Sequence, residues 1–406
     1  MTLRVSTSGL HAQGLAALLR HQSQIARTQQ QLTTGTRITQ AKDDPVAASN
    51  AQRLDHVLAM LGEYGRGAEQ VDNRLRLQEE ALADTGSALS RVRELAIQGN
   101  NAPLSDNDRK AIATEIRQLR ASLIAIGNRD DGNGRRLFAG TRDGVVPFVD
   151  NVGSVSYAGD DGQNRIDIAP EIAIADTDPG SAVFLRVRTG DGTMRATAGS
   201  TNTGTGVLGS ANVGDPIAWN GRSLSVRFTS ATDYEVVDGS GAALVPAVAG
   251  TWTAGQAIPD STAGLGVQFR ITGAPAAGDT FTIERAPTRD VFATLDALAD
   301  SLEAPTVTPA DAARRANALA SAIGDIATAE DHMLTLRAST GMRLQELDSA
   351  GERRSSEKVT LAGTLSELRD THFAEAISRL SLQMTALEAA QKSMLRIQGL
   401  SLFDKL

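Results

Sequence analysis

The sequence contains no cysteine, and aromatic residues make up only 3% of its 406 positions. Without thiols the chain cannot form disulfides, use thiolate catalysis or bind zinc through sulfur. Its five histidines are scattered, and none stands at the spacing of a metal-ligand pair. An aromatic content of 3% is low for a large compact core, but it suits long helices that pack through leucine and alanine. We therefore expect no metal, no cofactor and no catalytic residue.

Long apolar runs are also missing. No stretch approaches the length of a membrane-spanning helix, and the N-terminus lacks the apolar segment of a secretory signal peptide. The formal net charge of −8 argues against a nucleic-acid partner, because such proteins concentrate lysine and arginine. We expect neither a nucleic-acid nor a membrane partner. At this point we predict a soluble, cytoplasmic protein, unless export uses a signal that is not cleaved.

The clearest positive feature is a coiled-coil seam of 43 residues, from Leu54 to Ala96. Its steps alternate between three and four residues, which places all members on one face of a helix. Only two members are clearly polar. The seam consists of Leu54, Val57, Leu61, Tyr64, Ala68, Val71, Leu75, Gln78, Leu82, Thr85, Leu89, Val92 and Ala96.

Both ends of the chain carry a similar but weaker pattern. The N-terminal arm repeats an aliphatic residue every seven positions, and the C-terminal arm repeats the alternation of three and four. Burying so few aliphatic side chains does not clearly offset the cost of ordering some forty residues, so each arm needs a partner helix. We predict an assembly interface formed by Leu18, Ile25, Leu32, Phe373, Ile377, Leu380, Met384, Leu387 and Met394.

Helix boundaries can be placed between these seams. Asp43 and Asp44 precede Pro45, and an acidic residue before a proline at the first helical position is a good helix start. The long seam helix is expected to run from there to about Gln98, where Gly99 begins a break. A third helix carrying the apolar residues of 112–126 should then form an antiparallel hairpin with it.

The middle of the chain has a different texture. Short runs rich in β-formers are separated by Gly, Asp, Asn and Pro, as in an all-β module. The runs are VSYAG, RIDIAP, AVFLRVR, SLSVRF, DYEVV, VQFRITG and DTFTIERA. The predicted fold is mainly α, with a long helical coiled-coil and bundle stalk formed by both termini and an inserted β module. We predict terminal arms at 1–42 and 365–406, a bundle at 43–145 and 286–364, and an outward-facing β insertion at 146–285.

Two short motifs resemble ligand-binding motifs, but each lacks a feature that such a site requires. Residues 204–209 match G-x-G-x-x-G, but no helix follows that could receive a pyrophosphate. The acidic, glycine-rich stretch at 128–134 lacks the carboxylate spacing and the closing glutamate of a calcium-binding EF-hand. We interpret the first as a chance match and the second as a turn after a helix.

Two longer stretches resemble a known family. LTTGTRITQAKDDPVAASNAQRL at 32–54 is similar to the N-terminal domain of flagellins, and FAEAISRLSLQMTALEAAQKSMLRIQGLSLFDKL at 373–406 to the matching C-terminal domain. Asp43-Asp44-Pro45 resembles the hook–filament junction branch of this family, since filament flagellins usually carry DDAAG. GNGRRLFAGT at 132–141, YAGDDGQNRIDIAP at 157–170 and the final SLFDKL are also typical of that branch. The resemblance does not extend over about 175–286.

The resemblance implies a structural subunit of the bacterial flagellum. Such proteins are exported by the flagellar type III apparatus without a cleaved signal and lie outside the cell. They assemble as a homo-oligomeric ring on hook-associated protein 1, and flagellin polymerises beyond them. The terminal arms form an inner coiled-coil core, the β insertion faces outward, and an export chaperone binds the C-terminal arm.

Three alternatives remain open at this point. A filament flagellin would share both terminal domains, although the DDP motif and the SLFDKL terminus argue against it. A secreted binding module would use the β insertion, whose Gly/Thr-rich loop is the only support. An enzyme hidden in the β insertion ranks last, because no residue grouping there suggests chemistry.

Overall fold

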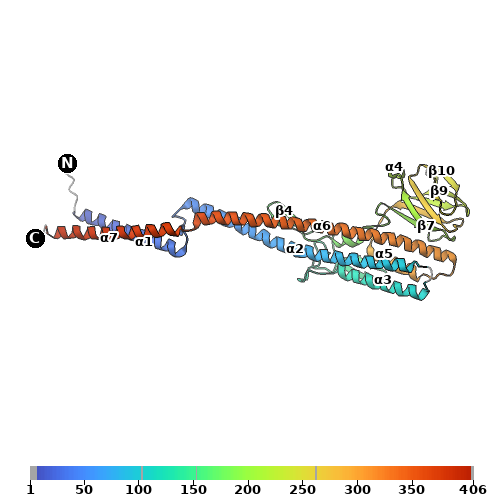
Figure 1. Cartoon of the computed structure of the whole chain (residues 1–406), viewed down its shortest axis with the longest axis horizontal. Coiled ribbons are helices and arrows are strands. Elements are labelled where there is room, and N and C mark those ends of the chain that lie inside the picture. Colours follow the sequence, from blue (N-terminus) through green and yellow to red (C-terminus); the bar gives the residue numbers. More distant parts are fainter. Residues whose placement is uncertain (1–6, 102–103, 152, 261–262, 404–406) are drawn as a thin grey trace. The chain divides into compact units, whose positions relative to one another are not determined.

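The computed structural model describes residues 7–101, 104–151, 153–260 and 263–403. The chain divides into two compact units, one of residues 1–66 and 349–406 and the other of residues 67–348. The first holds helix α1 (Thr7–Thr34) and helix α7 (Phe373–Phe403). Helices α2 (Pro45–Gly99) and α6 (Pro309–Arg369) contribute residues to both units. The mainly α fold with an inserted β module, predicted from the sequence, is confirmed (Figure 1).

Helix α2 begins at Pro45, as predicted, and its seam is buried along most of its length. Every seam position from Ala68 to Ala96 is buried. The two polar members find partners there, as buried polar groups require. The Gln78 Nε2 donates to Asp178 Oδ2 at 2.7 Å and to Thr340 Oγ1 at 2.8 Å, and the Thr85 hydroxyl donates to its own helix at Ala81.

Helices α2 and α6 enclose one hydrophobic core together with α3 (Asp106–Gly127) and α5 (Val291–Glu303). Leu89 and Val92 of α2, Ile116 of α3 and Leu298 of α5 are all buried in it. A capping box begins α3, in which Ser105 and Asp108 each accept the other's backbone N–H. The predicted second and third helices therefore share a core within one chain.

The first part of the predicted β insertion belongs to this helical core. Strands β1 (Phe148–Asn151) and β2 (Ser154–Tyr157) form one hairpin, and β3 (Arg165–Ala169) and β4 (Ile172–Ala175) form another. Strand β5 (Val187–Arg188) pairs with β14 (Thr288–Arg289). The Phe184 ring stacks on Phe292 of α5 and the Phe148 ring meets Phe292 edge-on, which ties this segment to the helices.

One predicted strand is wrong. The run AVFLRVR was expected to be extended, but Ser181–Leu185 form a π-helix, η1, and only Val187–Arg188 are extended. Its apolar run is equally compatible with a buried helical turn, so periodicity could not decide. The aromatic contacts of Phe184 with Phe138 and Phe148 favour the helical turn.

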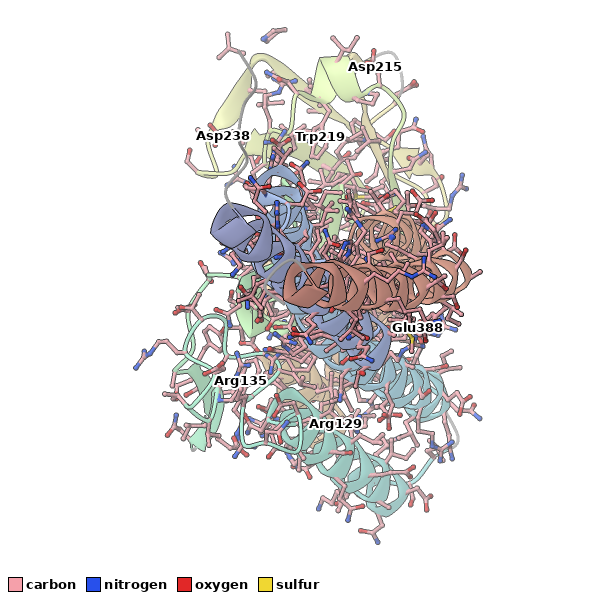
Figure 2. All side chains as sticks on the ribbon, turned by 90° about the vertical axis from the view of Figure 1, so that its left-hand side faces the viewer. Arg129, Arg135, Asp215, Trp219, Asp238 and Glu388 are labelled. Atoms are coloured by element: carbon pink, nitrogen blue, oxygen red, sulfur yellow. The ribbon has the colours of Figure 1, made fainter. Side chains whose placement is uncertain are left out.

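A separate β module follows, with a core of its own. One antiparallel sheet has the order β10-β9-β8-β13-β6 and the other the order β11-β12-β7. Both sheets contribute to one core, in which Phe228, Phe269 and Phe281 are buried. Trp219 belongs to the short helix α4 at the rim of the module, next to Asp215 (Figure 2). The strands are β6 (Met194–Ala198), β7 (Val207–Val213), β8 (Leu224–Phe228), β9 (Asp233–Asp238), β10 (Ala243–Thr251), β11 (Ala257–Ile258), β12 (Val267–Thr272) and β13 (Thr280–Arg285), and α4 spans Pro216–Trp219.

The G-x-G-x-x-G match lies in this module and leads into strand β7. The backbone N–H groups of Thr203 and Gly204 donate to the buried Asp279 carboxylate, at 2.7 and 3.1 Å. The chain's own carboxylate therefore occupies the donors that a phosphate would need.

Candidate assembly surface and the loop anchored to helix α2

Helices α1 and α7 lie side by side and run antiparallel within one chain (Figure 1). Gly14 faces Met394 near one end, and Gly35 faces Phe373 near the other. Between them, the Thr28 hydroxyl donates to Gln383 Oε1 at 2.9 Å. The two terminal arms therefore pack on each other.

The predicted interface residues divide into two groups on this pair. Leu18, Ile25 and Leu32 of α1 are half-buried, and so are three members on α7, which are Leu380, Leu387 and Met394. The other three, Phe373, Ile377 and Met384, have exposed fractions of 53%, 54% and 50%. Beside them on α7, Ala376 is buried and Gln383 accepts the Thr28 hydroxyl of α1, so the side of α7 that faces α1 is displaced from these three residues.

We name Phe373, Ile377 and Met384 the exposed α7 stripe. Their spacing of four and seven residues places them on one face of the helix, because four and seven residues complete about one and two turns. Apolar side chains gathered on one helix face are costly to leave in water and are typical of interaction surfaces. The stripe therefore offers a surface that the α1 contact leaves open.

A short clasp joins the two arms at one end of the pair. The Arg37 N–H donates to Arg369 O at 2.7 Å, and the Thr371 N–H donates to Gly35 O at 2.9 Å. Helix α1 ends at Thr34, before the end of the terminal arm predicted for 1–42. Gly35 has φ of +71° and its N–H closes the last turn onto Gln31, so it ends the helix as a left-handed cap.

The Asp43-Asp44-Pro45 motif shapes the connection from this clasp into α2. The Asp43 carboxylate accepts the Thr39 hydroxyl and the Gln40 N–H, both at 3.0 Å. The Thr39 hydroxyl is the main cause that holds the pKa of Asp43 below its usual value. The Asp44 carboxylate accepts the Ala47 N–H at 3.0 Å, which caps α2. The motif thus fixes a turn and a helix start, and we assign it no ligand.

Replacing the capping carboxylate should loosen the start of α2. Asp44→Ala is expected to cost about 1 kcal/mol and to speed hydrogen exchange in the first turn of α2 roughly fivefold. Asp55→Ala is the matched control, because Asp55 lies further along the same helix and makes only an exposed ion pair with Arg369. Equal exchange rates in the two variants would contradict the capping role.

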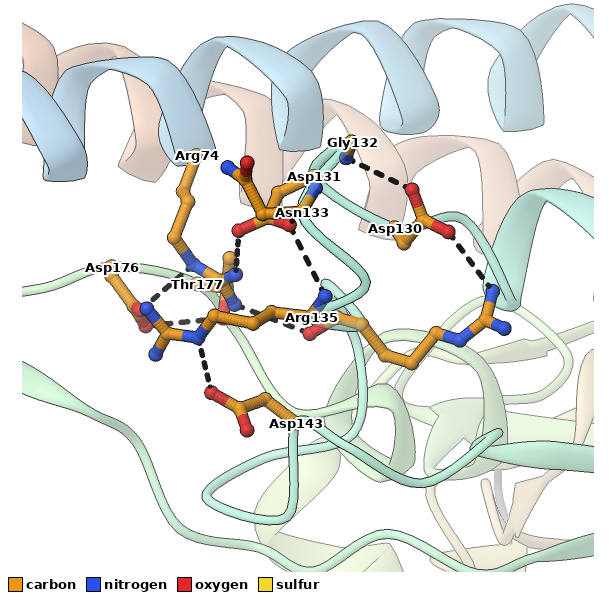
Figure 3. A network of polar contacts seen from close by, with 10 residues as sticks. Arg74, Asp130, Asp131, Gly132, Asn133, Arg135, Asp143, Asp176 and Thr177 are labelled. Atoms are coloured by element: carbon orange, nitrogen blue, oxygen red, sulfur yellow. Dashed lines mark hydrogen bonds and ion pairs between the residues drawn. The ribbon is translucent and has the colours of Figure 1, made fainter.

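The second feature is a loop of residues 128–143 held against α2 by one buried arginine (Figure 3). Arg74 has an exposed fraction of 1%. Its guanidinium lies 3.1 Å from Asp131 Oδ2 and 2.8 Å from Asp176 Oδ2, and it also donates to Arg136 O at 3.2 Å. The arginine therefore connects α2, the loop and the segment after β4.

The loop is further organised by its own carboxylates. Asp131 accepts the backbone N–H groups of Asn133 and Arg135, at 2.9 and 3.2 Å, and Asp143 pairs with Arg135 at 2.6 Å (Figure 3). Burial alone would raise the pKa of Asp131, but these N–H donors and Arg74 together hold it below its usual value. The acidic, glycine-rich stretch is thus satisfied by the chain itself.

The role of Arg74 was not predicted from the sequence. Its available signal was its place three residues after Val71, beside the apolar seam. Within residues 7–101, 104–151, 153–260 and 263–403, no group of three or more His, Asp or Glu is arranged to hold a metal ion. In the same ranges, no helix combines the length and apolarity needed to span a bilayer.

Comparison with known proteins agrees with this architecture. The family model of the bacterial flagellin N-terminal helical region matches residues 5–143. Flagellar hook-associated protein 3 of Escherichia coli (strain K12) is 25% identical over 403 residues, which cover 99% of both chains.

Two solved structures are similar as well. The crystal structure of Xanthomonas campestris FlgL has 46% identity and a TM-score of 0.71, covering 77% of this chain and 99% of that one. The flagellar junction protein FlgL from Legionella pneumophila has 25% identity and a TM-score of 0.69, covering 79% of this chain and all of the other.

The class defined by the paired terminal helices and the flagellin-type N-terminal region is that of flagellin-like structural components of the bacterial flagellum. Within that class, the chain belongs to the family of flagellar hook-associated protein 3, FlgL.

Proposed function

We propose that this chain forms the junction between the hook and the flagellin filament, as a ring seated on hook-associated protein 1. The observation that carries the proposal is the exposed α7 stripe beside the pair formed by the first helix, α1, and the last helix, α7. A subunit that joins two neighbours needs an apolar surface left over after its own helices have packed. The name of the Legionella protein, a flagellar junction protein, supports the same role.

The assembly interface that we propose contains all nine predicted residues. Leu18, Ile25, Leu32, Leu380, Leu387 and Met394 hold the α1–α7 pair, and the exposed α7 stripe contacts a neighbouring subunit. We also propose that the chain leaves the cell through the flagellar type III apparatus, with an export chaperone on the C-terminal arm. It has no catalytic role in this proposal.

Loss of the chain from cells tests the junction role. After deletion of the gene for this chain, we expect hooks without filaments and unpolymerised flagellin in the culture medium. A plasmid that carries the gene should reverse both effects. Normal filaments in the deletion strain would contradict the proposal. Growth of the purified chain into long filaments would favour a filament flagellin, although the flagellin model matches only residues 5–143 whereas hook-associated protein 3 matches 99% of the chain.

Hydrogen exchange on the purified chain tests the idea that assembly stabilises the arms. In the α1–α7 pair most described side chains are exposed and few are buried, whereas α2 is buried from Val71 to Ala96 at every seam position. We expect fast exchange in α1 and α7, slow exchange in that part of α2, and protection of both arms after assembly. Strong protection of the arms in the isolated chain would contradict this mechanism.

A further inference from the structure

A cavity of about 430 Å³ lies between strand β6, helix α5 and the N-terminal part of α6. Its volume falls in the range of small-molecule sites. Four arginines line it, Arg195, Arg289, Arg314 and Arg315, against the two carboxylates of Asp311 and Asp325. The cavity therefore carries excess positive charge in a chain whose formal net charge is −8.

Both carboxylates are already paired with their own arginines. Asp325 pairs with Arg195 at 2.8 Å, and Asp311 pairs with Arg314. These two arginines are therefore neutralised locally, and their side chains are held in place.

Arg289 and Arg315 have no such partner. Arg289 donates to the backbone oxygen of Ala293 at 3.1 Å, and Arg315 donates to the Thr306 hydroxyl. In the part of the chain that the structure describes, no carboxylate forms an ion pair with either guanidinium. Guanidinium groups bind carboxylate and phosphate with paired N–H donors, so two unpaired ones in a cavity favour an anion.

Another arginine, which is not one of the four that line the cavity, also favours an anion there. Arg109 of α3 is buried, with an exposed fraction of 7%, and pairs with Asp106 at 2.7 Å. Its Nε and Nη1 have no hydrogen-bond partner among the described residues. Burial, and then the nearby charge of Arg109, lower the pKa of Arg315. An anion beside Arg315 would offset this repulsion.

The other residues that line the cavity can contact the uncharged carbon skeleton of a ligand, which we call its organic body. Ala297, Leu298 and Ala322 supply apolar surface, and Thr197 and Ser301 supply hydroxyl groups. We propose that the cavity binds a small organic acid, whose carboxylate or phosphate group pairs with Arg289 and Arg315 while its body lies against α5 and α6.

Isothermal titration calorimetry on the full chain tests the proposal, with succinate, citrate, glycerol 3-phosphate and inorganic phosphate as probes. At least one organic acid should bind at one site per chain and more tightly than inorganic phosphate, which lacks an organic body. The carboxylate and phosphate probes identify which acid group is preferred. Arg289→Gln and Arg315→Gln should each weaken binding about tenfold, because each removes a charged hydrogen bond.

Arg270→Gln is the matched control. It removes the same charge from an exposed position in the β module, where Arg270 donates to Gly255 O, and should leave binding unchanged. Absence of binding by every probe would overturn the proposal, as would equal affinities in Arg289→Gln and the control or preferential binding of inorganic phosphate.

Discussion

Arg74→Met is expected to destabilise the helical core by about 3–5 kcal/mol, because it leaves two buried carboxylates without their cation. Asp131 and Asp176 both face the guanidinium, at 3.1 and 2.8 Å. Methionine keeps much of the volume of the arginine stem, so the loss of charge dominates the effect. The backbone of Arg136 also loses a donor.

The two cores allow this effect to be localised. Both tryptophans of the chain, Trp219 and Trp252, lie in the core of the β module. In Arg74→Met, the unfolding transition of the helices, followed by circular dichroism, should therefore move to lower denaturant concentration. The transition followed by tryptophan fluorescence should stay in place. Arg76→Met is the control, since Arg76 is two residues away on α2, is exposed and forms its one ion pair among the described residues with the half-buried Asp72. Equal shifts in both variants would show that the buried ion pairs are not the cause.

The loss of stability in Arg74→Met relative to the unchanged chain, called the deficit below, should be larger near neutral pH than in acid. Burial raises the pKa of Asp176 above its usual value, and Arg74 offsets part of that rise. A carboxyl group whose pKa is raised in the folded state stabilises that state while it is protonated. This stabilisation is lost as the pH rises through the folded pKa. Without Arg74 the pKa of Asp176 rises further, so the deficit is largest near neutral pH and shrinks in acid. Asp131 acts in the other way, because its pKa is held below the usual value. The stability that it gains from pairing with Arg74 is lost as the pH falls through that pKa, which also shrinks the deficit in acid.

A second substitution separates charge from packing. Adding Asp176→Asn to Arg74→Met should restore part of the lost stability at neutral pH, because one buried carboxylate, Asp131, is then left without its cation instead of two. The double variant should keep only the part of the pH dependence that comes from Asp131. If Asp176→Asn deepens the deficit instead, the role of Arg74 is mainly steric.

Local patterns predicted much of the fold. The α2 seam could be assigned because its period of three and four persists over many turns, and burial from Ala68 to Ala96 confirms it. Strands β8, β9, β12 and β13 were found because β-forming runs lay between turn residues. The π-helix was missed because its geometry depends on ring contacts of Phe184 with residues far away in sequence.

The division of the β-rich region could not be predicted from local patterns either. Phe148 and Val187 pack in the helical core, whereas Phe228 and Phe281 pack in the core of the β module. Both groups look alike in sequence, since each is an apolar residue in a short strand. The Arg74 ion pairs were missed for the same reason, because 57 residues separate Arg74 from Asp131.

The terminal seams show a different limit. Spacing identified which face of α7 is apolar, but it could not tell which members pack on α1 and which stay open. That depends on how far the helix is rotated, and small side chains decide it. Ala376 allows close approach at a position that the seam did not include, and the exposed α7 stripe results.

Leu380→Asp is expected to abolish junction assembly and swimming, because Leu380 lies between α1 and the exposed α7 stripe. A carboxylate there is costly to bury in either contact. The β module should stay folded, as its tryptophan fluorescence would report. Export has to be measured in the same cells, since the variant chain must appear in the culture medium before loss of assembly can be attributed to docking. A motile strain with filaments would contradict the proposed interface.

Ile377→Asp separates docking from pairing within the chain. Ile377 is 54% exposed, so a carboxylate there should leave the α1–α7 pair and its hydrogen exchange unchanged while assembly is still lost. Ser378→Asp adds the same charge at the next position, outside the stripe, and should assemble normally. Normal assembly of Ile377→Asp would leave the α1–α7 pair as the only element that Leu380→Asp disrupts. The exposed α7 stripe would then have to be removed from the interface, because a carboxylate in the centre of a dry apolar contact cannot be accommodated without a large loss of binding.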